Sequence, residues 1–463
     1  MTDPRKMRTD VVLPNGDIVN NDDYETRING NMVAFGSTGA SKTRSISETN
    51  LAYTAANQED ISQIVVDMKG TLSRKYAQLY RENGYDVKIL SFSNTRISNK
   101  YSPLKYVKTT EDIASITDYF IKMDGSEDSH QDPFWDNAAR FLINHAIYES
   151  LKEENFSNIC NILREKSTWS SGFRKRFIND ERDNSWGDLQ FKNACVQPDK
   201  TYHSTVSVAL AKFSSFESEE IKELLSEDEM DLHNLYKKKT IIFVEISDVD
   251  QSKNVLANLF INQAMQVLCE DATHYKNGRL PMQVRFICDD YGVGCVIHKY
   301  PLYLPNMRSK GINSIILTQS YSQLKSYHDD NSANTILANC DTQIFMGGID
   351  IDTCNYFAEL FDMPAKKIKN LPREECLIYR RGYMEAQVRK MDIDEFLDKH
   401  NITLPEPLEG DYKLESDSES KEDRRLREEV LREKIRNELL AELHETDDDF
   451  YDSFIFEGNP DDE

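Results

Sequence analysis

The chain of 463 residues has no long apolar run. No segment approaches the roughly 20 consecutive apolar residues that cross a bilayer, and the N-terminal sequence MTDPRKMRTD lacks the apolar centre of a signal peptide. These absences argue against a membrane-spanning or secreted protein. We expect a protein that stays in the cytosol unless a partner holds it at a membrane.

Closely spaced cysteine pairs are also absent, because the eight cysteines are scattered and none belongs to a CxxC motif. They are Cys160, Cys195, Cys269, Cys288, Cys295, Cys340, Cys354 and Cys376. Several lie in apolar runs, where a thiol behaves as a small hydrophobic group. This pattern predicts reduced, buried cysteines rather than a disulfide framework or a zinc site.

Basic residues are outnumbered: 56 Lys and Arg stand against 80 Asp and Glu, which gives a formal net charge of −24. Such a balance does not suit non-specific attraction to nucleic acid, although a local basic channel is compatible with it. Much of the acid follows Pro405, so the preceding chain is less acidic than the total indicates. The length allows two or three hydrophobic cores.

Short apolar runs recur along the chain and predict a mostly parallel sheet. The expected strands cover residues 32–35, 64–66, 87–92, 240–246, 284–288, 314–318, 343–346 and 376–379. Several are continuously apolar, which is typical of strands covered on both faces, and helical patterns separate most of them. The sequence therefore predicts an α/β sandwich.

Between residues 109 and 237 the sequence has helical patterns and no convincing strand. The clearest pattern begins at Asp132 and Pro133, where Asp132 can cap a helix and Pro133 can open it. Further helices are expected at about 156–165, 201–213 and 219–225. Because strand-rich sequence flanks this region on both sides, we predict an all-α domain inserted into the sheet.

The chain becomes polar and charged after residues 404–407. One side of a predicted helix at about 421–444 carries Leu431, Ile435, Leu439 and Leu443, and mixed charges surround them. The remainder has the composition of a disordered segment. We expect an acidic, partly helical or disordered tail, whose role as a docking segment or as a solvated solubilising segment stays open.

A loop at residues 36–43 follows the first apolar run and is close to the Walker A pattern. It consists of Gly36, Ser37, Thr38, Gly39, Ala40, Ser41, Lys42 and Thr43. In such a loop, backbone N–H groups surround a polyphosphate, the lysine neutralises it, and the threonine hydroxyl reaches Mg²⁺. The expected ligand is ATP or GTP. A tight glycine-rich turn between a strand and a helix is the alternative interpretation.

One position of the loop departs from the pattern, since Ser41 stands where a glycine is expected before the lysine. If the backbone of Ser41 must adopt a left-handed conformation, the cost is on the order of 1–3 kcal/mol, or roughly one to two decades of affinity. We therefore expect weaker nucleotide binding, but not its loss.

Two carboxylates, Asp289 and Asp290, close the apolar run at 284–288. In nucleotide hydrolases the first acid at such a strand end holds Mg²⁺ and the second orients the attacking water. An exposed turn would be the better interpretation of an isolated Asp-Asp pair. With the 36–43 loop upstream, the pair favours catalysis.

Two further polar residues are candidates for the same chemistry. Gln319 ends the apolar run at 314–318 and could sense a γ-phosphate or its attacking water, or could simply form a hydrogen bond at the strand end. Arg308 could reach the nucleotide of a neighbouring subunit, and such an arginine finger contributes about 10³–10⁵ in rate. The alternative for Arg308 is a surface ion pair.

The order of these motifs resembles the type IV coupling proteins of conjugation and type IV secretion, the TraG/TraD-like ATPases. The matching segments are 36–43, 64–70 (IVVDMKG), 83–87 (NGYDV), 101–104 (YSPL), 132–135 (DPFW), 289–290 (DD), 307–312 (MRSKGI) and 319–324 (QSYSQL). They follow the family order from about residue 30 to residue 390. Together they are specific, although none would suffice alone.

This resemblance implies a RecA-like P-loop NTPase domain interrupted by an all-α domain, with copies of the chain assembling as a homohexameric ring at a secretion channel. It implies a polar segment at 1–23, the RecA-like domain at 24–108 and 237–403, the inserted domain at 109–236 and the acidic tail at 404–463. It also implies that Lys42 and Thr43 bind ATP and Mg²⁺, that Asp289 is the Walker B acid, and that Asp67 and Lys69 lie beside the phosphate-binding loop.

By the same resemblance, Asp290 occupies the position of the usual glutamate, Gln319 is the phosphate sensor and Arg308 is the candidate finger. Three departures bear on this. Ser41 replaces a glycine and Asp290 is one methylene shorter than glutamate, which concerns the hydrolysis rate. The sequence contains no counterpart of the paired N-terminal transmembrane helices common in the family, so we expect a separate membrane anchor protein.

The leading hypothesis is an ATP-driven coupling protein that recruits relaxase-bound single-stranded DNA, or a protein substrate, to a type IV secretion channel and drives its transfer. Its expected partners are the relaxase, the channel proteins and the anchor, and its expected location is the inner face of the cell membrane. Two alternatives stay open. One is a docking receptor with a degenerate nucleotide site, and the other is an FtsK/HerA-like DNA translocase, which the helical insertion and residues 132–135 make less suitable.

Overall fold

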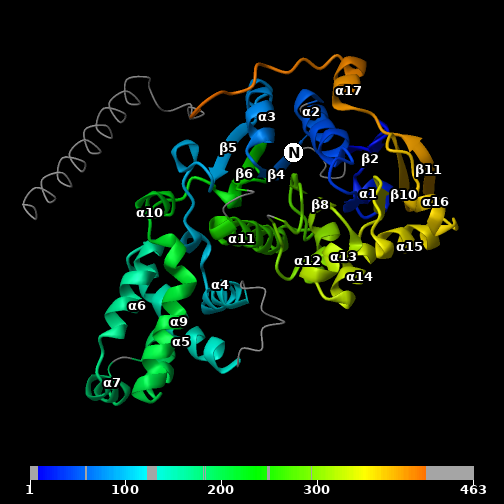
Figure 1. Ribbon diagram of the computed structural model, residues 1–463. Coiled ribbons are helices and arrows are strands. Elements are labelled where there is room, and N and C mark those ends of the chain that lie inside the picture. The colour runs from blue at the N-terminus through cyan, green and yellow to red at the C-terminus, as the bar shows by residue number, and fades with distance from the viewer. Residues whose placement is uncertain are drawn as a thin grey trace, which may run out of the picture. The chain divides into compact units, whose positions relative to one another are not determined.

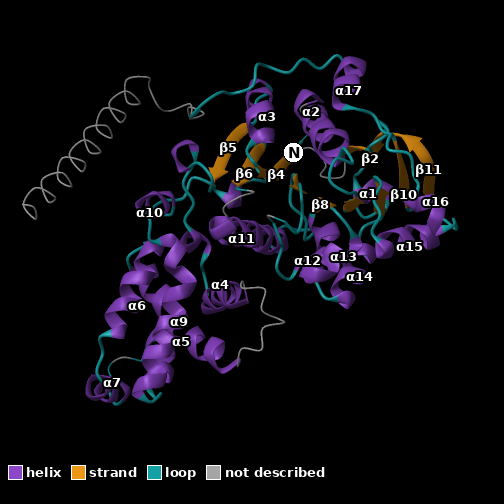
Figure 2. Ribbon diagram, in the orientation of Figure 1, coloured by secondary structure: helices purple, strands orange, loops and turns teal. Residues whose placement is uncertain are grey.

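The computed structural model of the chain describes residues 9–57, 60–122, 133–180, 182, 184–247, 251–293 and 295–412. A nine-stranded sheet lies at its centre (Figure 2). From one edge to the other, its strands are β11 (Tyr383–Arg389), β10 (Glu375–Arg380), β9 (Thr342–Phe345), β3 (Met32–Phe35), β8 (Ile312–Thr318), β7 (Gln283–Cys288), β4 (Ile61–Met68), β6 (Thr240–Ile246) and β5 (Asp86–Ser91). The strands from β9 to β5 are parallel, and β10 and β11 are antiparallel additions. The predicted α/β class is confirmed.

All eight predicted strands form; β3 and β6 have the predicted bounds, β5 and β9 are shifted by one residue, and β4, β7, β8 and β10 are longer than predicted. β3, β6, β7 and β8 are buried along their whole length, as expected of strands covered on both faces. Three strands were not predicted: the edge strand β11 and the hairpin of β1 (Asp10–Val12) and β2 (Ile18–Asn20). β11 is mostly exposed, so it needs no apolar run, and the hairpin strands have only three residues each.

Helices cover both faces of the sheet (Figure 1). One face carries α2 (Glu48–Asn57), α3 (Thr71–Glu82) and α17 (Ile393–His400). The other carries α11 (Asn254–Thr273), α12 (Tyr300–Lys310), α13 (Tyr321–Tyr327), α14 (Asp330–Ala338) and α15 (Ile351–Leu360). The short helices α1 (Asp23–Thr26) and α16 (Ala365–Lys369) complete this part of the chain. Helices on both faces explain why the central strands are buried along almost their whole length.

Between β5 and β6, the described residues form seven α-helices. They are α4 (Thr110–Lys122), α5 (Pro133–Lys152), α6 (Ile159–Ser167), α7 (Ser171–Ile178), α8 (Trp186–Cys195), α9 (Asp199–Phe213) and α10 (Glu219–Leu224). The four predicted helices correspond to α5, α6, α9 and α10, while α4, α7 and α8 were not predicted. α5 begins at Pro133 as expected, whereas the proposed cap Asp132 lies outside the described residues.

The inserted helices share one hydrophobic core with the helices of the sheet. Phe120 and Phe213 pack with ring centroids 4.5 Å apart, and both belong to a continuous buried cluster that includes Phe260 of α11. The hydroxyl of Tyr119 in α4 also donates to the backbone oxygen of Val255 at 3.0 Å. Because burial of each such aromatic side chain contributes about 1.5–3 kcal/mol, the inserted helices are fastened to the sheet by packing.

The prediction of buried cysteines is confirmed, since all eight are buried and none forms a disulfide. Among the helices that the structure describes, none combines the length and the apolar character of a membrane crossing. The predicted helix at 421–444 lies outside the described residues.

Candidate nucleotide site

The 36–43 loop lies at the carboxyl edge of the parallel strands, in the middle of the sheet. β3 pairs with β8 on one side and with β9 on the other. The backbone N–H of Gly36 donates to Thr318 O at 3.1 Å, and that of Ser37 donates to Gly347 O at 2.9 Å. Ligands of open α/β sheets bind at this edge, so the fold places the loop where a ligand site is expected.

Ser41 has a φ of +64°, within the left-handed region that favours glycine. An L-residue in this region costs about 1–2 kcal/mol more than glycine, because its Cβ crowds the following carbonyl oxygen. The Ser41 side chain is exposed, so it displaces no packed neighbour. The structure therefore places at Ser41 the backbone strain that the missing glycine predicts.

Lys42 is folded into the loop and only 7% exposed. Its Nζ donates to the backbone oxygen of Gly36 at 2.7 Å. Burial lowers the pKa of Lys42, and the negative charges of Asp290 and Asp289 oppose that shift. The charge of Lys42 is thus held inside the loop, close to both acids of β7.

Asp289 and Thr43 are in direct contact. The Thr43 hydroxyl donates to Asp289 Oδ2 at 2.7 Å, which joins the end of the loop to the end of β7. Asp289 is 6% exposed, and its Oδ1 is buried and accepts no hydrogen bond from the described residues. Burial raises the pKa of Asp289 to about 6. A buried carboxylate oxygen without a donor is uncommon, and a hard divalent cation such as Mg²⁺ would satisfy it.

Asp290 has a φ of +51° and begins a tight turn in which its backbone oxygen accepts the N–H of Val293 at 3.0 Å. Asp and Asn adopt this conformation several times more readily than longer side chains. The turn therefore gives a backbone reason for the shorter acid at this position.

Gln319 and Arg308 lie at opposite ends of the parallel strands, Gln319 at the carboxyl ends and Arg308 at the amino ends. Thr318 pairs with Phe35, so Gln319 follows directly beside Gly36, and its side chain is exposed. Arg308 is at the C-terminal end of α12, which leads into the amino end of β8. Its Nε lies 4.0 Å from Asp23 Oδ2. The fold thus brings Gln319 to the loop and keeps Arg308 away from the loop of its own chain.

Asp67 lies near the end of β4 and Lys69 follows it, and β4 is two strands from β8. The carboxylate of Asp67 accepts the backbone N–H groups of Thr71 at 3.1 Å and Ser73 at 2.8 Å. Burial raises the pKa of Asp67 to about 7, and the charges of Glu245 and Asp289 add to the shift. Lys69 has a φ of +95°. Asp67 therefore organises a strained turn next to the strand that carries Asp289.

Comparison with known proteins settles the family. Residues 5–364 match the family described as type IV secretory system conjugative DNA transfer. The chain belongs to this family. The resemblance inferred from the motifs is therefore confirmed. No curated protein sequence is significantly similar to the chain.

Solved structures similar to this member of the conjugative DNA transfer family include several of the plasmid coupling protein TrwB. Unbound TrwBdeltaN70 is 15% identical, with a TM-score of 0.59 over 84% of this chain and 90% of that one. TrwB in complex with the ATP analogue ADPNP is 14% identical, with a TM-score of 0.61 over 88% of this chain and 94% of that one. TrwB with ADP and Mg²⁺ is 13% identical, with a TM-score of 0.59 over 84% and 90%. At these identities the likeness shows a shared fold.

Two buried polar residues at the same edge, Lys390 and Glu245, belong to none of the motifs predicted from the sequence. Nζ of Lys390, just after β11, donates to the backbone oxygens of Ala40 at 3.2 Å and Met346 at 3.1 Å, and so supports the 36–43 loop. Glu245, at the end of β6, is 3% exposed. A carboxylate within the apolar run at 240–246 was the signal for Glu245, but no local pattern marks Lys390.

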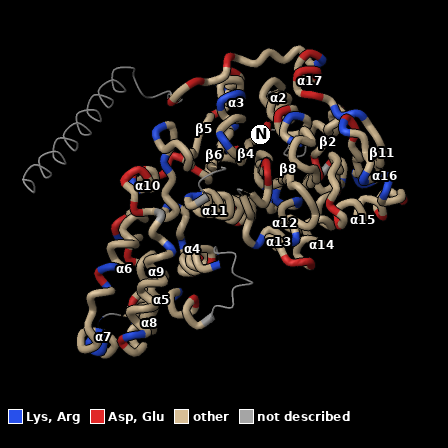
Figure 3. The backbone as a smooth tube through the Cα atoms, viewed as in Figure 1, with Lys and Arg blue, Asp and Glu red and all other residues tan. Residues whose placement is uncertain are grey.

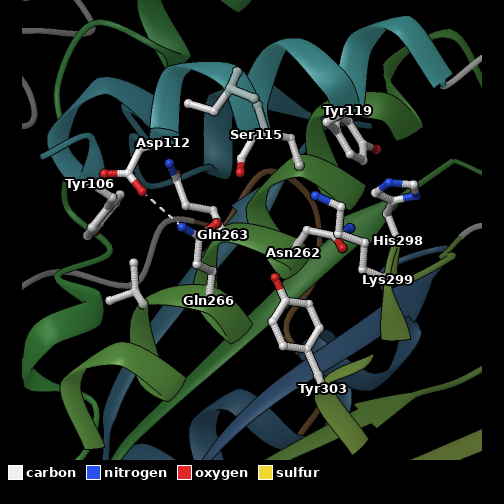
Figure 4. A pocket seen from close by; sticks show the side chains of 13 residues that line it. Tyr106, Asp112, Ser115, Tyr119, Asn262, Gln263, Gln266, His298, Lys299 and Tyr303 are labelled. Atoms are coloured by element: carbon white, nitrogen blue, oxygen red, sulfur yellow. Dashed lines mark hydrogen bonds between the residues drawn. The ribbon is translucent and has the colours of Figure 1, made fainter. Parts of the chain in front are cut away.

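A small cavity lies apart from this edge, between α4, α11 and the start of α12 (Figure 4). Its volume is about 40 Å³, and its lining includes Asp112, Gln266, His298 and Tyr303. Gln266 Nε2 donates to Asp112 Oδ1 at 2.9 Å across it. This volume holds about two or three water molecules, so the cavity does not compete with the 36–43 loop as a nucleotide site.

Proposed function

We propose that the chain is an ATP-dependent coupling protein that recruits relaxase-bound single-stranded DNA, a protein substrate, or both, to a type IV secretion channel. One observation carries the catalytic part of this proposal, the contact of the Thr43 hydroxyl with Asp289 at 2.7 Å beside the buried charge of Lys42. Family membership supports the transfer role. Transfer is driven by ATP hydrolysis in a homohexameric ring.

The residues at this edge suit ATP and Mg²⁺. Lys42 can turn its ammonium from the oxygen of Gly36 to a phosphate oxygen, which replaces a hydrogen bond to a neutral carbonyl by one to an anionic oxygen. The free Oδ1 of Asp289 and the hydroxyl of Thr43 would hold the metal ion. Bound Mg²⁺ would neutralise charge on the phosphate oxygens. TrwB in complex with ADP and Mg²⁺ supports this choice of ligands.

Each remaining candidate has a distinct role in the proposal. Asp290 orients the attacking water, and Gln319 senses the γ-phosphate beside Gly36. Because Arg308 lies at the other edge of its own sheet, it would act on the nucleotide of the neighbouring subunit in the ring. Lys69 supports the phosphate-binding loop together with Asp67. The RecA-like domain at 24–108 and 237–403 performs this chemistry, and the insertion at 109–236 handles cargo.

The distribution of charged residues bears on how the protein would contact DNA. Lys and Arg are interspersed with Asp and Glu along the described chain, and adjacent basic residues lie in α7 (Figure 3). Given the net charge of −24, DNA contact depends on such local groups rather than on the overall field. A separate anchor protein holds the ring at the inner face of the membrane, where it meets the channel proteins, and the acidic tail at 404–463 docks the relaxase or an accessory protein.

Phosphate release from Mg-ATP, with and without single-stranded DNA, tests the proposal. The variant Lys42→Ala should lose at least about 100-fold in turnover, as expected for a preorganised charge at the reacting phosphates. Lys276→Ala, an exposed lysine in the turn after α11, is the matched control and should retain full activity. Equal turnover in the wild type and Lys42→Ala would exclude the motor function.

The strained Ser41 and the short Asp290 favour a second candidate, a docking receptor that binds nucleotide without turning it over. Tight binding of a labelled ATP analogue, together with no phosphate release at any DNA concentration, would support the receptor. Stimulation by double-stranded rather than single-stranded DNA would instead indicate an FtsK/HerA-like translocase.

A further inference from the structure

Residues 401–412 run from the end of α17 past α3 on the outer side of the helices, and we call this segment the strap (Figure 1). The backbone N–H of Leu408 donates to Arg74 O at 3.0 Å. Further on, Asp411 Oδ1 accepts Asn94 Nδ2 at 2.7 Å, which ties the strap to the loop after β5. The strap is the last described part of the chain, and these two hydrogen bonds hold it against α3 and the loop after β5.

The strap ends with Tyr412, which inserts its hydroxyl into the protein and is only 8% exposed. This hydroxyl donates to Glu245 Oε1 at 3.0 Å and lies 3.0 Å from Ser73 Oγ. Ser73 Oγ donates to the same Glu245 oxygen at 2.5 Å. The guanidinium of Arg74 covers the Tyr412 ring at 5.4 Å from its centroid. The hydroxyls of Tyr412 and Ser73 thus both donate to one oxygen of this buried carboxylate.

That carboxylate lies against the turn that follows β4. A Cβ added to Gly70 would stand 3.1 Å from the carboxylate of Glu245, so the two groups are in close contact. Lys69 and Gly70 have φ values of +95° and +65°, and the N–H of Lys69 donates to Ile246 O at 3.1 Å. A non-glycine residue with such a φ persists only when its surroundings hold it there. Glu245 is one of the groups that surround this turn.

The turn is one strand away from the proposed metal ligand. Asp67 pairs with Glu245 across β4 and β6, and Val66 pairs with Cys288 across β4 and β7. Asp67 and Asp289 therefore come directly after the last residue pair between β4 and β7. Three carboxylates from adjacent strands meet at this edge, and their mutual repulsion favours separation unless donors fix each of them. Tyr412 and Ser73 supply the donors for Glu245.

We propose that Tyr412 is a positioning residue for the nucleotide site. With Ser73 it fixes Glu245, and Glu245 holds the Lys69–Gly70 turn beside Asp67 and the strand of Asp289. This inference rests on the proposed function for its effect on hydrolysis, but not for its effect on the turn. A Tyr412 that only fastened the strap would leave both the turn and hydrolysis unchanged when its hydroxyl is removed.

The test compares Tyr412→Phe with Tyr236→Phe in the full chain. Tyr236 is a matched control, because its hydroxyl donates to a buried carboxylate, Asp271 Oδ2, at the same 3.0 Å and it is 5% exposed. Amide hydrogen exchange of residues 69–73 is measured first, since it needs no turnover. We expect Tyr412→Phe to speed this exchange at least about tenfold and Tyr236→Phe to leave it unchanged. Unchanged exchange in Tyr412→Phe would overturn the proposal.

The rate of ATP hydrolysis is measured next. The wild type gives the full rate, and Lys42→Ala gives the background rate. Tyr412→Phe should lower kcat about three- to tenfold, below the ~100-fold of an ångström-scale displacement, and leave nucleotide affinity within about twofold. Ser73→Ala should act on kcat non-additively with it, because both hydroxyls serve one carboxylate. A wild-type kcat in Tyr412→Phe would overturn the positioning role. Absence of turnover in the wild type would refute the proposed function, while the exchange measurement would still decide whether Tyr412 holds the turn.

Discussion

Replacing Ser41 by glycine gives the most direct measure of what the departure in the 36–43 loop costs. At a φ of +64°, serine carries a strain of about 1–2 kcal/mol that glycine lacks. Glycine adds about 0.5–1 kcal/mol of backbone entropy to the unfolded chain. The net gain of Ser41→Gly, from the unfolded chain to the nucleotide-bound protein, is therefore about 0–1.5 kcal/mol. It is shared between folding stability and nucleotide affinity.

The changes in folding stability and in nucleotide affinity can both be measured. Urea denaturation gives the change in the free energy of unfolding, and titration with a labelled ATP analogue gives the change in Kd. A gain that falls entirely on binding would tighten Kd up to about tenfold, because 1.4 kcal/mol corresponds to one decade. We expect the summed gain to be positive and to lie within this range.

Ser41→Ala is the control, because it keeps Cβ and hence the strain while it removes the hydroxyl. It should match the wild type in both stability and affinity to within about 0.5 kcal/mol, as an exposed substitution does. If Ser41→Gly behaves like Ser41→Ala, or is both less stable and weaker in binding, strain at this position does not limit the loop.

Three more predictions concern the acids and the candidate finger. The pKa of Asp67 is raised from 3.8 to about 7, so its ionisation opposes folding. As the pH rises from about 4 to about 7, the free energy of unfolding of the wild type should therefore fall by up to about 4 kcal/mol relative to that of Asp67→Asn, as measured by urea denaturation. A pH-independent difference would contradict this. Asp290→Asn keeps a side chain that tolerates a φ of +51°, so its stability should stay within about 0.5 kcal/mol while phosphate release falls at least about tenfold; an unchanged rate would remove Asp290 from the mechanism. Arg308→Ala and Lys42→Ala should each be inactive, but an equal mixture should recover about a quarter of the wild-type rate, since each interface takes its residues from two subunits. No recovery would argue against action between subunits.

Most strands of the sheet could be predicted from the sequence alone, because the central strands are buried on both faces. Short, mainly apolar runs marked all eight of the strands predicted, from β3 through β10. β11 escaped because an exposed edge strand carries no such run, and its residues are largely polar. α7 and α8 escaped for a related reason, as short helices on the outer part of the insertion expose much of their surface. Periodicity reports burial, so elements with little buried surface leave little trace.

Local sequence also determined the centre of the candidate site. The 36–43 loop and the acids at 289 and 290 are contiguous motifs, and the parallel sheet brings their strand ends to one edge whatever the loops between them do. The position of Ser41 in the loop pattern was enough to predict the backbone strain, and the structure places that strain there.

Tertiary structure decided the rest, because distant segments contribute single residues that no local pattern marks. Lys390 reaches the 36–43 loop from beyond β11, and Tyr412 reaches Glu245 from the end of the strap. Arg308 was visible in the sequence, yet only the sheet placed it at the edge opposite the loop. Sequence spacing thus fixes which groups follow the strands, while long-range pairing decides which of them meet. Hydrogen-bond partners separated by more than a hundred residues are chosen by the packing of the whole fold.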